Sequence, residues 1–136
     1  MPVTELNHVN LRTPYETMLK LKDFYCDVVG LKVGPREGFT SRGYWLYIGD
    51  AAANANAVVH LAEYRGDGEL LTNVLTTVDH ISFTCTDMPA TEAHLKQHNI
   101  EYSIRDLPVL NVKQINFKDP VGNGIELFFH LENEKV

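Results

Sequence analysis

Leu6-Asn7-His8-Val9-Asn10-Leu11 is the stretch that decides the fold, because its design returns as Val78-Asp79-His80-Ile81-Ser82-Phe83. Apolar and polar residues alternate around a histidine in both copies, which is the pattern of a half-buried β-strand. Neighbouring side chains of a strand point to opposite faces, so each copy has an apolar face for packing and a polar face that carries the histidine. A duplicated strand of this kind predicts two halves that contribute ligands to one site.

The first half continues with a helix and three further strands. Apolar residues at helical spacing follow the first strand, expected at Thr4–Arg12, and Gly30 suits the left-handed end of that helix. The later strands are predicted at Leu31–Val33, Tyr44–Ile48 and Val58–Tyr64, with Asp50–Ala57 as a hairpin loop and Arg65–Thr77 as the link to the second half.

The second half repeats this order. A strand at Val78–Thr84 precedes a helix at Met88–His98, and strands follow near Glu101–Arg105, Val112–Phe117 and Gly124–His130. Each half therefore reads βαβββ. We predict a single α+β domain over residues 1–136, built from two paired βαβββ modules at about 1–65 and about 77–131. The modules are expected to form a curved eight-stranded mixed sheet with helices outside and a concave cup inside.

Composition excludes several classes of protein. The net charge of −6, with 12 Lys and Arg against 18 Asp and Glu, argues against nucleic acid as a partner, because phosphate backbones select clustered basic residues. Apolar runs are too short to cross a bilayer, and the N-terminal residues lack a secretory pattern. We therefore expect a cytoplasmic protein without a membrane partner. Cys26 and Cys85 have no metal-type spacing and are interpreted as reduced thiols.

Strand alternation places four possible metal ligands on the concave face. His8 and His80 lie on the polar faces of the repeated strands. Val59 and Leu61 suit the helix-packed face of their strand, which leaves His60 on the other side. The same alternation in the last strand puts Glu126 on the concave side.

Three imidazoles and one carboxylate are a ligand set for one divalent ion such as Zn, Ni, Fe or Mn. On an octahedral ion, four protein ligands leave two adjacent positions open. A small oxygenated substrate can occupy both positions with two oxygens, and the ion then acts as a Lewis acid. The sequence therefore predicts a metal site that binds a small-molecule substrate bidentately.

Four short motifs spread over nearly the whole chain resemble those of a known family. They are Asn7-His8-Val9, Phe24-Tyr25 with Gly30-Leu31, Asp79-His80-Ile81, and Asp119-Pro120-Val121-Gly122-Asn123-Gly124-Ile125-Glu126-Leu127. The last is similar to the Asp-Pro-x-Gly-Asn-x-Ile-Glu-Leu ending of the vicinal oxygen chelate superfamily. That superfamily includes glyoxalase I, methylmalonyl-CoA epimerase, extradiol catechol dioxygenases, and the fosfomycin and bleomycin resistance proteins.

The resemblance implies that His8, His80 and Glu126 are metal ligands. His60 lies in the strand where glyoxalase I carries glutamate and the epimerases glutamine. The implied function is a divalent-metal-dependent lyase or isomerase of glyoxalase I type, acting as a homodimer. Glu126 is then the base by default, and His60 is the other candidate for a catalytic role.

Two other functions stay open. The triad His8, His80 and Glu126 also matches the iron ligands of the extradiol ring-cleaving dioxygenases, in which case His60 is not a ligand. A non-catalytic drug-binding protein, like the bleomycin binders, needs no metal ligands at all.

Further polar residues are candidates for substrate contacts. We predict that Arg12, Asn10 and Gln114 bind substrate, with Arg12 at the mouth of the cup, where a guanidinium can hold a carboxylate. Weaker candidates are Ser82, Thr84 and Asn116. His94 and His98 are interpreted as surface residues of a helix, and His130 as a structural residue at the rim.

Overall fold

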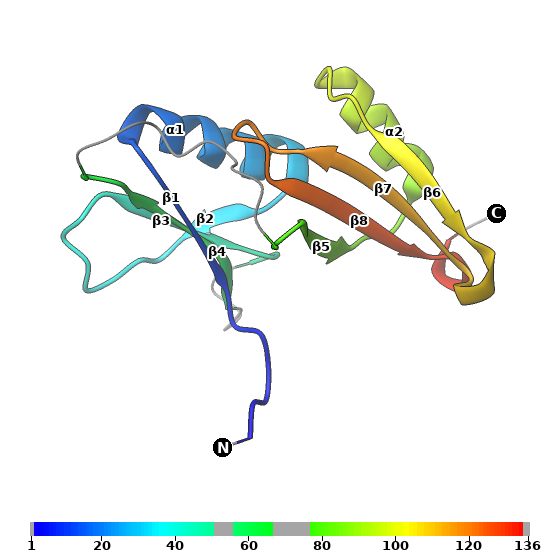
Figure 1. Ribbon diagram of the computed structural model, residues 1–136, viewed down its shortest axis with the longest axis horizontal. Coiled ribbons are helices and arrows are strands. Elements are labelled where there is room, and N and C mark those ends of the chain that lie inside the picture. The colour runs from blue at the N-terminus through cyan, green and yellow to red at the C-terminus, as the bar shows by residue number, and fades with distance from the viewer. Residues whose placement is uncertain (1, 51–55, 67–76, 135–136) are drawn as a thin grey trace. The chain divides into compact units, whose positions relative to one another are not determined.

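The computed structural model describes residues 2–50, 56–66 and 77–134. It divides into two compact units, unit 1 at Met1–Leu71 and unit 2 at Thr72–Val136, each of which is described by itself (Figure 1). Residues 51–55 of the predicted hairpin loop and 67–76 of the predicted link lie outside the described residues.

The described residues of unit 1 form one four-stranded sheet, one α-helix and one π-helical turn. Its elements are β1 (Val9–Thr13), α1 (Tyr15–Phe24), the π-helical turn η1 (Tyr25–Val29), β2 (Lys32–Gly34), β3 (Gly43–Tyr47) and β4 (Ala57–Glu63). The strand order is β1-β4-β3-β2, with β1 parallel to β4 and the other pairs antiparallel. The first and last strands of the unit are therefore neighbours, and the helix provides the crossover that a parallel pair requires.

Unit 2 repeats this topology. Its elements are β5 (His80–Thr84), α2 (Met88–Gln97), β6 (Ser103–Leu107), the 3-10 turn η3 (Pro108–Leu110), β7 (Val112–Lys118), β8 (Gly124–His130) and the 3-10 turn η4 (Leu131–Asn133). The strand order is β5-β8-β7-β6, again with a single parallel pair between the first and last strands. The predicted α+β fold with paired βαβββ modules is confirmed, and the eight strands of the described part of the chain form two sheets of four.

One face of the sheet in unit 1 is packed against α1. Met18, Leu21 and Phe24 are the buried residues of this helix, at the spacing of a single apolar stripe. The sheet contributes Leu46, Val59 and Leu61, each at most 1% exposed, so odd-numbered positions of β4 form the core. In unit 2 the core comes from alternate residues of β8, namely Ile125, Leu127 and Phe129. Burying each such side chain stabilises the fold by about 1.5–3 kcal/mol, and this fixes which residues lie on the opposite, polar face.

The two repeated strands are shorter than the sequence predicts. The first was expected to begin at Thr4 but β1 begins at Val9, and the second was expected at Val78 but β5 begins at His80. β4 starts only at Ala57 and pairs Val59 with Val9, so the chain before Asn7 lies beyond the end of its partner strand. Residues 2–8 are accordingly exposed, and the N-terminal end of this segment extends away from the sheet of unit 1 (Figure 1).

The turn between β7 and β8 is held by a single buried carboxylate. Oδ1 of Asp119 accepts hydrogen bonds from the backbone N–H groups of Val121 (3.0 Å) and Asn123 (2.9 Å). Its Oδ2 accepts one from the Asn123 side-chain amide at 2.8 Å. Gly124 follows at a close approach of two strands, where a Cβ atom would lie 2.4 Å from the carbonyl oxygen of Asp79. The Asp-Pro-x-Gly-Asn motif therefore sets the register of β8, and with it the position of Glu126.

None of the helices in the described part of the chain combines the length and the apolar character that a membrane span requires.

We expect Asp119→Ala to lower the free energy of unfolding by about 2–4 kcal/mol, because it removes the acceptor of three hydrogen bonds in a buried turn. Urea denaturation at neutral pH measures this loss. The matched control is Asp106→Ala on β6, where the carboxylate is exposed, and its effect should stay within about 0.5 kcal/mol. Equal losses in the two variants would contradict the role given to this turn.

Candidate functional site

In unit 1, two of the predicted ligands are in direct contact. The imidazole rings of His8 and His60 stack with their centroids 3.7 Å apart and an interplanar angle of 9°. The other face of His60 stacks on Trp45, at 4.4 Å and 15°. Register explains this column of rings, because His60 is paired with Asn10 on β1 and with Trp45 on β3. All of these side chains lie on the face of the sheet opposite α1.

The polar neighbours of the two rings differ. Nδ1 of His8 lies 2.7 Å from Oδ1 of Asn7, an amide oxygen that can only accept, so Nδ1 is the donor of this contact and Nε2 is not part of it. The pKa of His60 is lowered, first by burial and then by the positive charge that His8 and Arg36 can carry. Neutral imidazole is therefore the favoured form of His60, and neutral imidazole is the form that binds metals.

In unit 2, the other two predicted ligands are neighbours. Nδ1 of His80 lies 2.8 Å from the Asp79 carboxylate, and its Nε2 lies 3.5 Å from Oε2 of Glu126. Glu126 is 8% exposed, and its Oε1 accepts a hydrogen bond from the Ser82 hydroxyl at 3.0 Å. Ser82 on β5 thus holds one carboxylate oxygen of Glu126, and the other oxygen faces His80.

The two pairs occupy equivalent positions in the two sheets. In unit 1 the residue two places after His8, Asn10, is paired with His60. In unit 2 the residue two places after His80, Ser82, is paired with Glu126. Each unit therefore places one histidine and one second donor on the same face of its parallel strand pair, and in each the histidine is oriented by an Asn or Asp immediately before it.

The structure brings His8 together with His60, and His80 together with Glu126. Within either unit, the described residues contain no group of three His, Cys, Asp or Glu side chains that could hold a metal ion. The stacked pair is also not a coordination geometry, because an imidazole binds metal along a lone pair in its ring plane, and the in-plane lone pairs of two parallel rings do not converge. His8 is exposed, so its ring can rotate out of the stack.

Unit 1 contains a cavity of about 900 Å³ beside this column of rings. Two of the predicted substrate-binding residues, Asn10 and Arg12, line it together with His8 and His60. The sequence patterns give no signal for several other lining residues, namely Arg36, Phe39, Glu63 and Arg65. Trp45 and Tyr47 also line the cavity, although aromatic residues on a strand more often belong to the core.

The third predicted substrate-binding residue, Gln114, lies in unit 2. It is 7% exposed, on the same face of the sheet as Glu126, and its Oε1 has no hydrogen-bond partner among the described residues.

The other histidines stand apart from these pairs: the rings of His94 and His98 are 4.5 Å apart at the end of α2, and His130 contacts Phe128.

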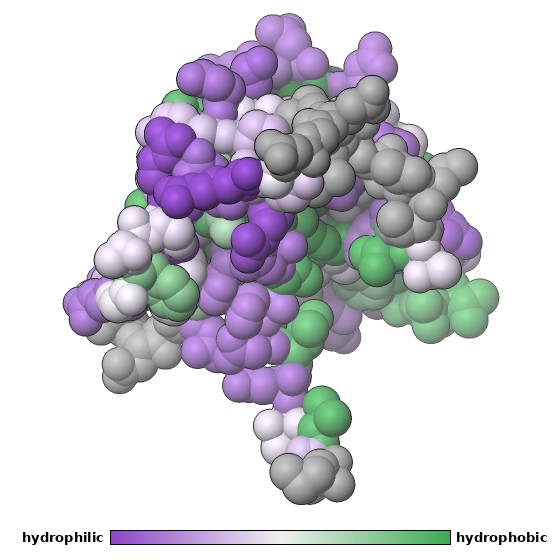
Figure 2. All heavy atoms as spheres, turned by 60° about the vertical axis from the view of Figure 1, so that its left-hand side comes forward, coloured by the Kyte–Doolittle hydropathy of each residue, from purple (hydrophilic) through white to green (hydrophobic). Residues whose placement is uncertain are grey.

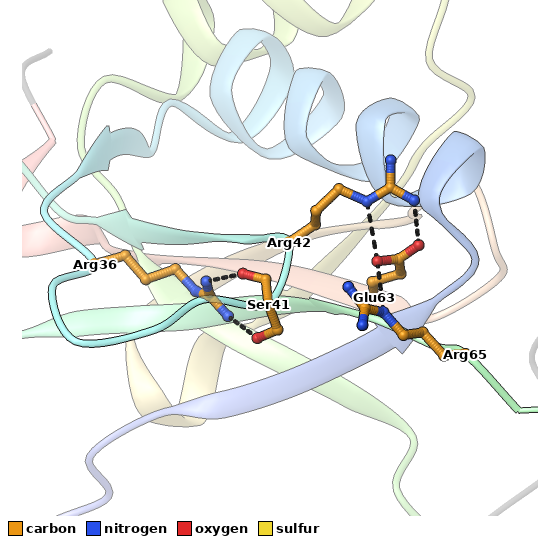
Figure 3. A network of polar contacts seen from close by, with 5 residues as sticks. All are labelled: Arg36, Ser41, Arg42, Glu63 and Arg65. Atoms are coloured by element: carbon orange, nitrogen blue, oxygen red, sulfur yellow. Dashed lines mark hydrogen bonds and ion pairs between the residues drawn. The ribbon is translucent and has the colours of Figure 1, made fainter.

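Glu63 at the edge of the cavity is the centre of a charged cluster. Arg42 binds both of its carboxylate oxygens, and Nε of Arg65 donates to Oε2 at 3.1 Å (Figure 3). Chiefly through the hydrogen bond from Arg42, the pKa of Glu63 falls from 4.5 to about 2. Arg36 is held separately, with its guanidinium donating to the carbonyl oxygen of Ser41 at 2.6 Å and to the hydroxyl at 3.2 Å. In Figure 2, hydrophilic residues (purple) lie on the visible face of the protein, with hydrophobic residues (green) between them.

Comparison with known proteins identifies the family. The model of the Glyoxalase/Bleomycin resistance protein/Dioxygenase superfamily matches residues 5–127. Uncharacterized protein YaeR of Escherichia coli K12 is 30% identical over 109 residues, which is 79% of this chain and 83% of that protein. The chain therefore belongs to the glyoxalase/bleomycin resistance protein/dioxygenase superfamily.

Solved structures share the fold. A glyoxylase/bleomycin resistance protein/dioxygenase domain from Frankia sp. EAN1pec has a TM-score of 0.69 and 18% identity, covering 95% of this chain and 93% of that one. Lactoylglutathione lyase from Agrobacterium tumefaciens has a TM-score of 0.64 and 14% identity, covering 97% and 98%. The resemblance stated from the sequence motifs is confirmed at the level of the superfamily and its fold.

The depressed pKa of Glu63 predicts a specific pH dependence. Because its pKa is lower in the folded protein than in the unfolded chain, the stability it contributes is present above pH 4.5 and is lost as the pH falls toward about 2. We expect Glu63→Gln to reduce the free energy of unfolding at neutral pH, and the difference from the wild type to shrink as the pH is lowered below 4.5. Urea denaturation across this range measures the difference. Glu101→Gln, at an exposed position, is the control, and a pH-independent effect of Glu63→Gln would contradict the ion-pair account.

Proposed function

We propose that this chain is a divalent-metal-dependent lyase or isomerase of glyoxalase I type. One ion per site, Zn, Ni, Fe or Mn, is held by His8, His60, His80 and Glu126, and the substrate is a small oxygenated molecule bound to it through two oxygens. The observation that carries the proposal is the repeated donor pair, one in each unit, at equivalent positions of the sheet.

The donor groups fit such an ion. Nδ1 of His8 and of His80 is engaged by the preceding Asn7 or Asp79, which leaves Nε2 of each ring for the metal. A hydrogen bond to the outer ring nitrogen is the usual support of a metal-binding histidine, because it fixes the tautomer and the ring orientation. Imidazole nitrogen with a single carboxylate oxygen suits first-row divalent ions. Binding requires the His8 and His60 rings to leave their parallel stack, so we expect this pair to rearrange when metal is added.

The bound ion would supply Lewis-acid polarisation of a substrate oxygen and so acidify a neighbouring C–H or O–H group. Glu126 is proposed as the base that takes this proton, since one of its oxygens is held by Ser82 and the other is not. Where His60 does not bind the ion, it is the alternative base, because its lowered pKa leaves it unprotonated and able to accept. Asn10, Arg12 and Gln114 are proposed to orient the substrate.

A second candidate is an extradiol-type iron dioxygenase, with iron on His8, His80 and Glu126. The contact that favours it is the packing of His60 between Trp45 and His8, which would keep this imidazole out of the ligand set. A non-catalytic drug-binding resistance protein remains the third reading. In either enzymatic case we propose that the protein acts as a homodimer on a small molecule in the cytoplasm, with neither nucleic acid nor membrane as a partner.

Metal titration of the metal-free protein tests the ligand set. We expect one ion per chain by calorimetry and elemental analysis, and a loss of more than about a hundredfold in affinity in His80→Ala and in Glu126→Gln. His98→Ala removes an exposed histidine at the end of α2 and should bind metal like the wild type. Unchanged affinity in His80→Ala or Glu126→Gln would contradict the proposed site.

His60→Ala separates the two enzymatic functions. If His60 is a ligand, the variant loses metal affinity by about as much as His80→Ala does. If the protein is a dioxygenase, the variant keeps its iron, and the iron-loaded wild type consumes oxygen in the presence of catechols. Zinc- or nickel-loaded protein that turns over a hydroxycarbonyl or hemithioacetal without oxygen uptake would support the lyase or isomerase.

A further inference from the structure

The cavity of unit 1 is locally cationic although the chain is acidic. The net charge of the chain is −6, but the side chains that line the cavity include three arginines, Arg12, Arg36 and Arg65, and one carboxylate, Glu63. Glu63 is bound by Arg65, which lines the cavity, and by Arg42, which does not. Its negative charge is therefore already compensated. A concave, positively charged surface on an acidic protein favours the entry of a small anion.

The three arginines differ in how they are engaged. Arg36 donates to Ser41 and lies over the ring of Phe39, with its guanidinium carbon 4.9 Å from the ring centre. Arg65 is paired with Glu63. Arg12 is exposed, and no oxygen of the described residues accepts a hydrogen bond from it. Its partner across the sheet is Ala62, which leaves the space beside it open. A free guanidinium has the fork of donors that binds a carboxylate through two hydrogen bonds.

One wall of the same cavity is a row of flat rings. Phe39, which is 55% exposed, contacts Trp45 at 5.4 Å, and the stack of Trp45, His60 and His8 continues from there. Rings that stack face to face turn their edges toward the cavity, and aromatic edges favour contact with the face of a flat ring. The cavity thus offers a row of ring edges along one wall and, beside it, a guanidinium that no oxygen of the described residues engages.

We propose that this cavity binds a small planar organic anion, an aromatic or enolic carboxylate, with its carboxylate on Arg12 and its flat part against Phe39 and Trp45. His8 and Arg12 are four residues apart on one face of the strand, about 13 Å along the backbone, and the long arginine side chain shortens this separation. A ligand of a single ring with a carboxylate fits between them. The place of this subsite in catalysis rests on the proposed function, in which the substrate's two chelating oxygens lie at the histidine end.

The intrinsic fluorescence of the protein can measure this binding, because Trp45 is the single tryptophan of the chain and lines the cavity. Metal-free protein is titrated with benzoate and, separately, with benzyl alcohol, which has the same ring without the charge. We expect benzoate to change the Trp45 fluorescence with a saturating curve and benzyl alcohol to bind at least about tenfold more weakly.

Substitutions of Arg12 test whether this residue binds the carboxylate. Arg12→Gln should weaken benzoate binding by about ten- to hundredfold, and Arg12→Lys, which keeps the charge but not the fork, should lie between it and the wild type. Lys20→Gln removes an exposed cation of α1 and should leave binding unchanged. Circular dichroism of each variant checks that it is folded.

Equal affinities for benzoate and benzyl alcohol, an unchanged affinity in Arg12→Gln, or no saturating response to benzoate would each overturn the subsite. Because this titration contains no metal, its outcome is independent of the metal titration. If the protein binds benzoate but no metal, the subsite stands and the proposed function is wrong. If it binds metal but not benzoate, the proposed function stands and the subsite is wrong.

Discussion

The structure depends on one constraint, the register of the parallel strand pair that closes each module. Pairing Asn10 with His60 in β1 and β4, and Ser82 with Glu126 in β5 and β8, places a histidine beside a second donor in both units. A shift of one residue would turn each donor toward the buried face, where Val59 and Ile125 now pack. Packing of the apolar side chains thus fixes the register, and the register fixes the position of the donors on the polar face. The buried turn at Asp119 and the close strand approach at Gly124 hold that register in unit 2.

Much of this could be predicted from the sequence because β-strands have a strict period of two. The repeat of His8 and His80, the apolar alternation of β4 and β8, and the Asp119–Gly124 turn are all local patterns. They were enough for the order of elements, for the paired modules and for the superfamily. The strand starts were less accurate, because the length of a strand depends on where its partner begins, which the residues of one strand do not encode.

Side-chain contacts between strands were the part that local patterns could not supply. The stack of His8, His60 and Trp45 depends on three strands in register, and the pairing of Glu63 with Arg42 and Arg65 joins residues from both sides of a hairpin. The hydrogen bonds of Asn7 and Asp79 to the following histidines depend on rotamers, although the residues themselves were visible in both repeats. These contacts decide which nitrogen is available to a metal and which arginine is free for a ligand.

The central proposal is that His8, His60, His80 and Glu126 are the ligands of one ion. X-ray absorption spectroscopy of the zinc- or nickel-loaded protein measures this most directly, because scattering within the imidazole ring distinguishes histidine from oxygen ligands. The account predicts three imidazoles and a carboxylate on each ion. Two imidazoles or fewer would contradict it.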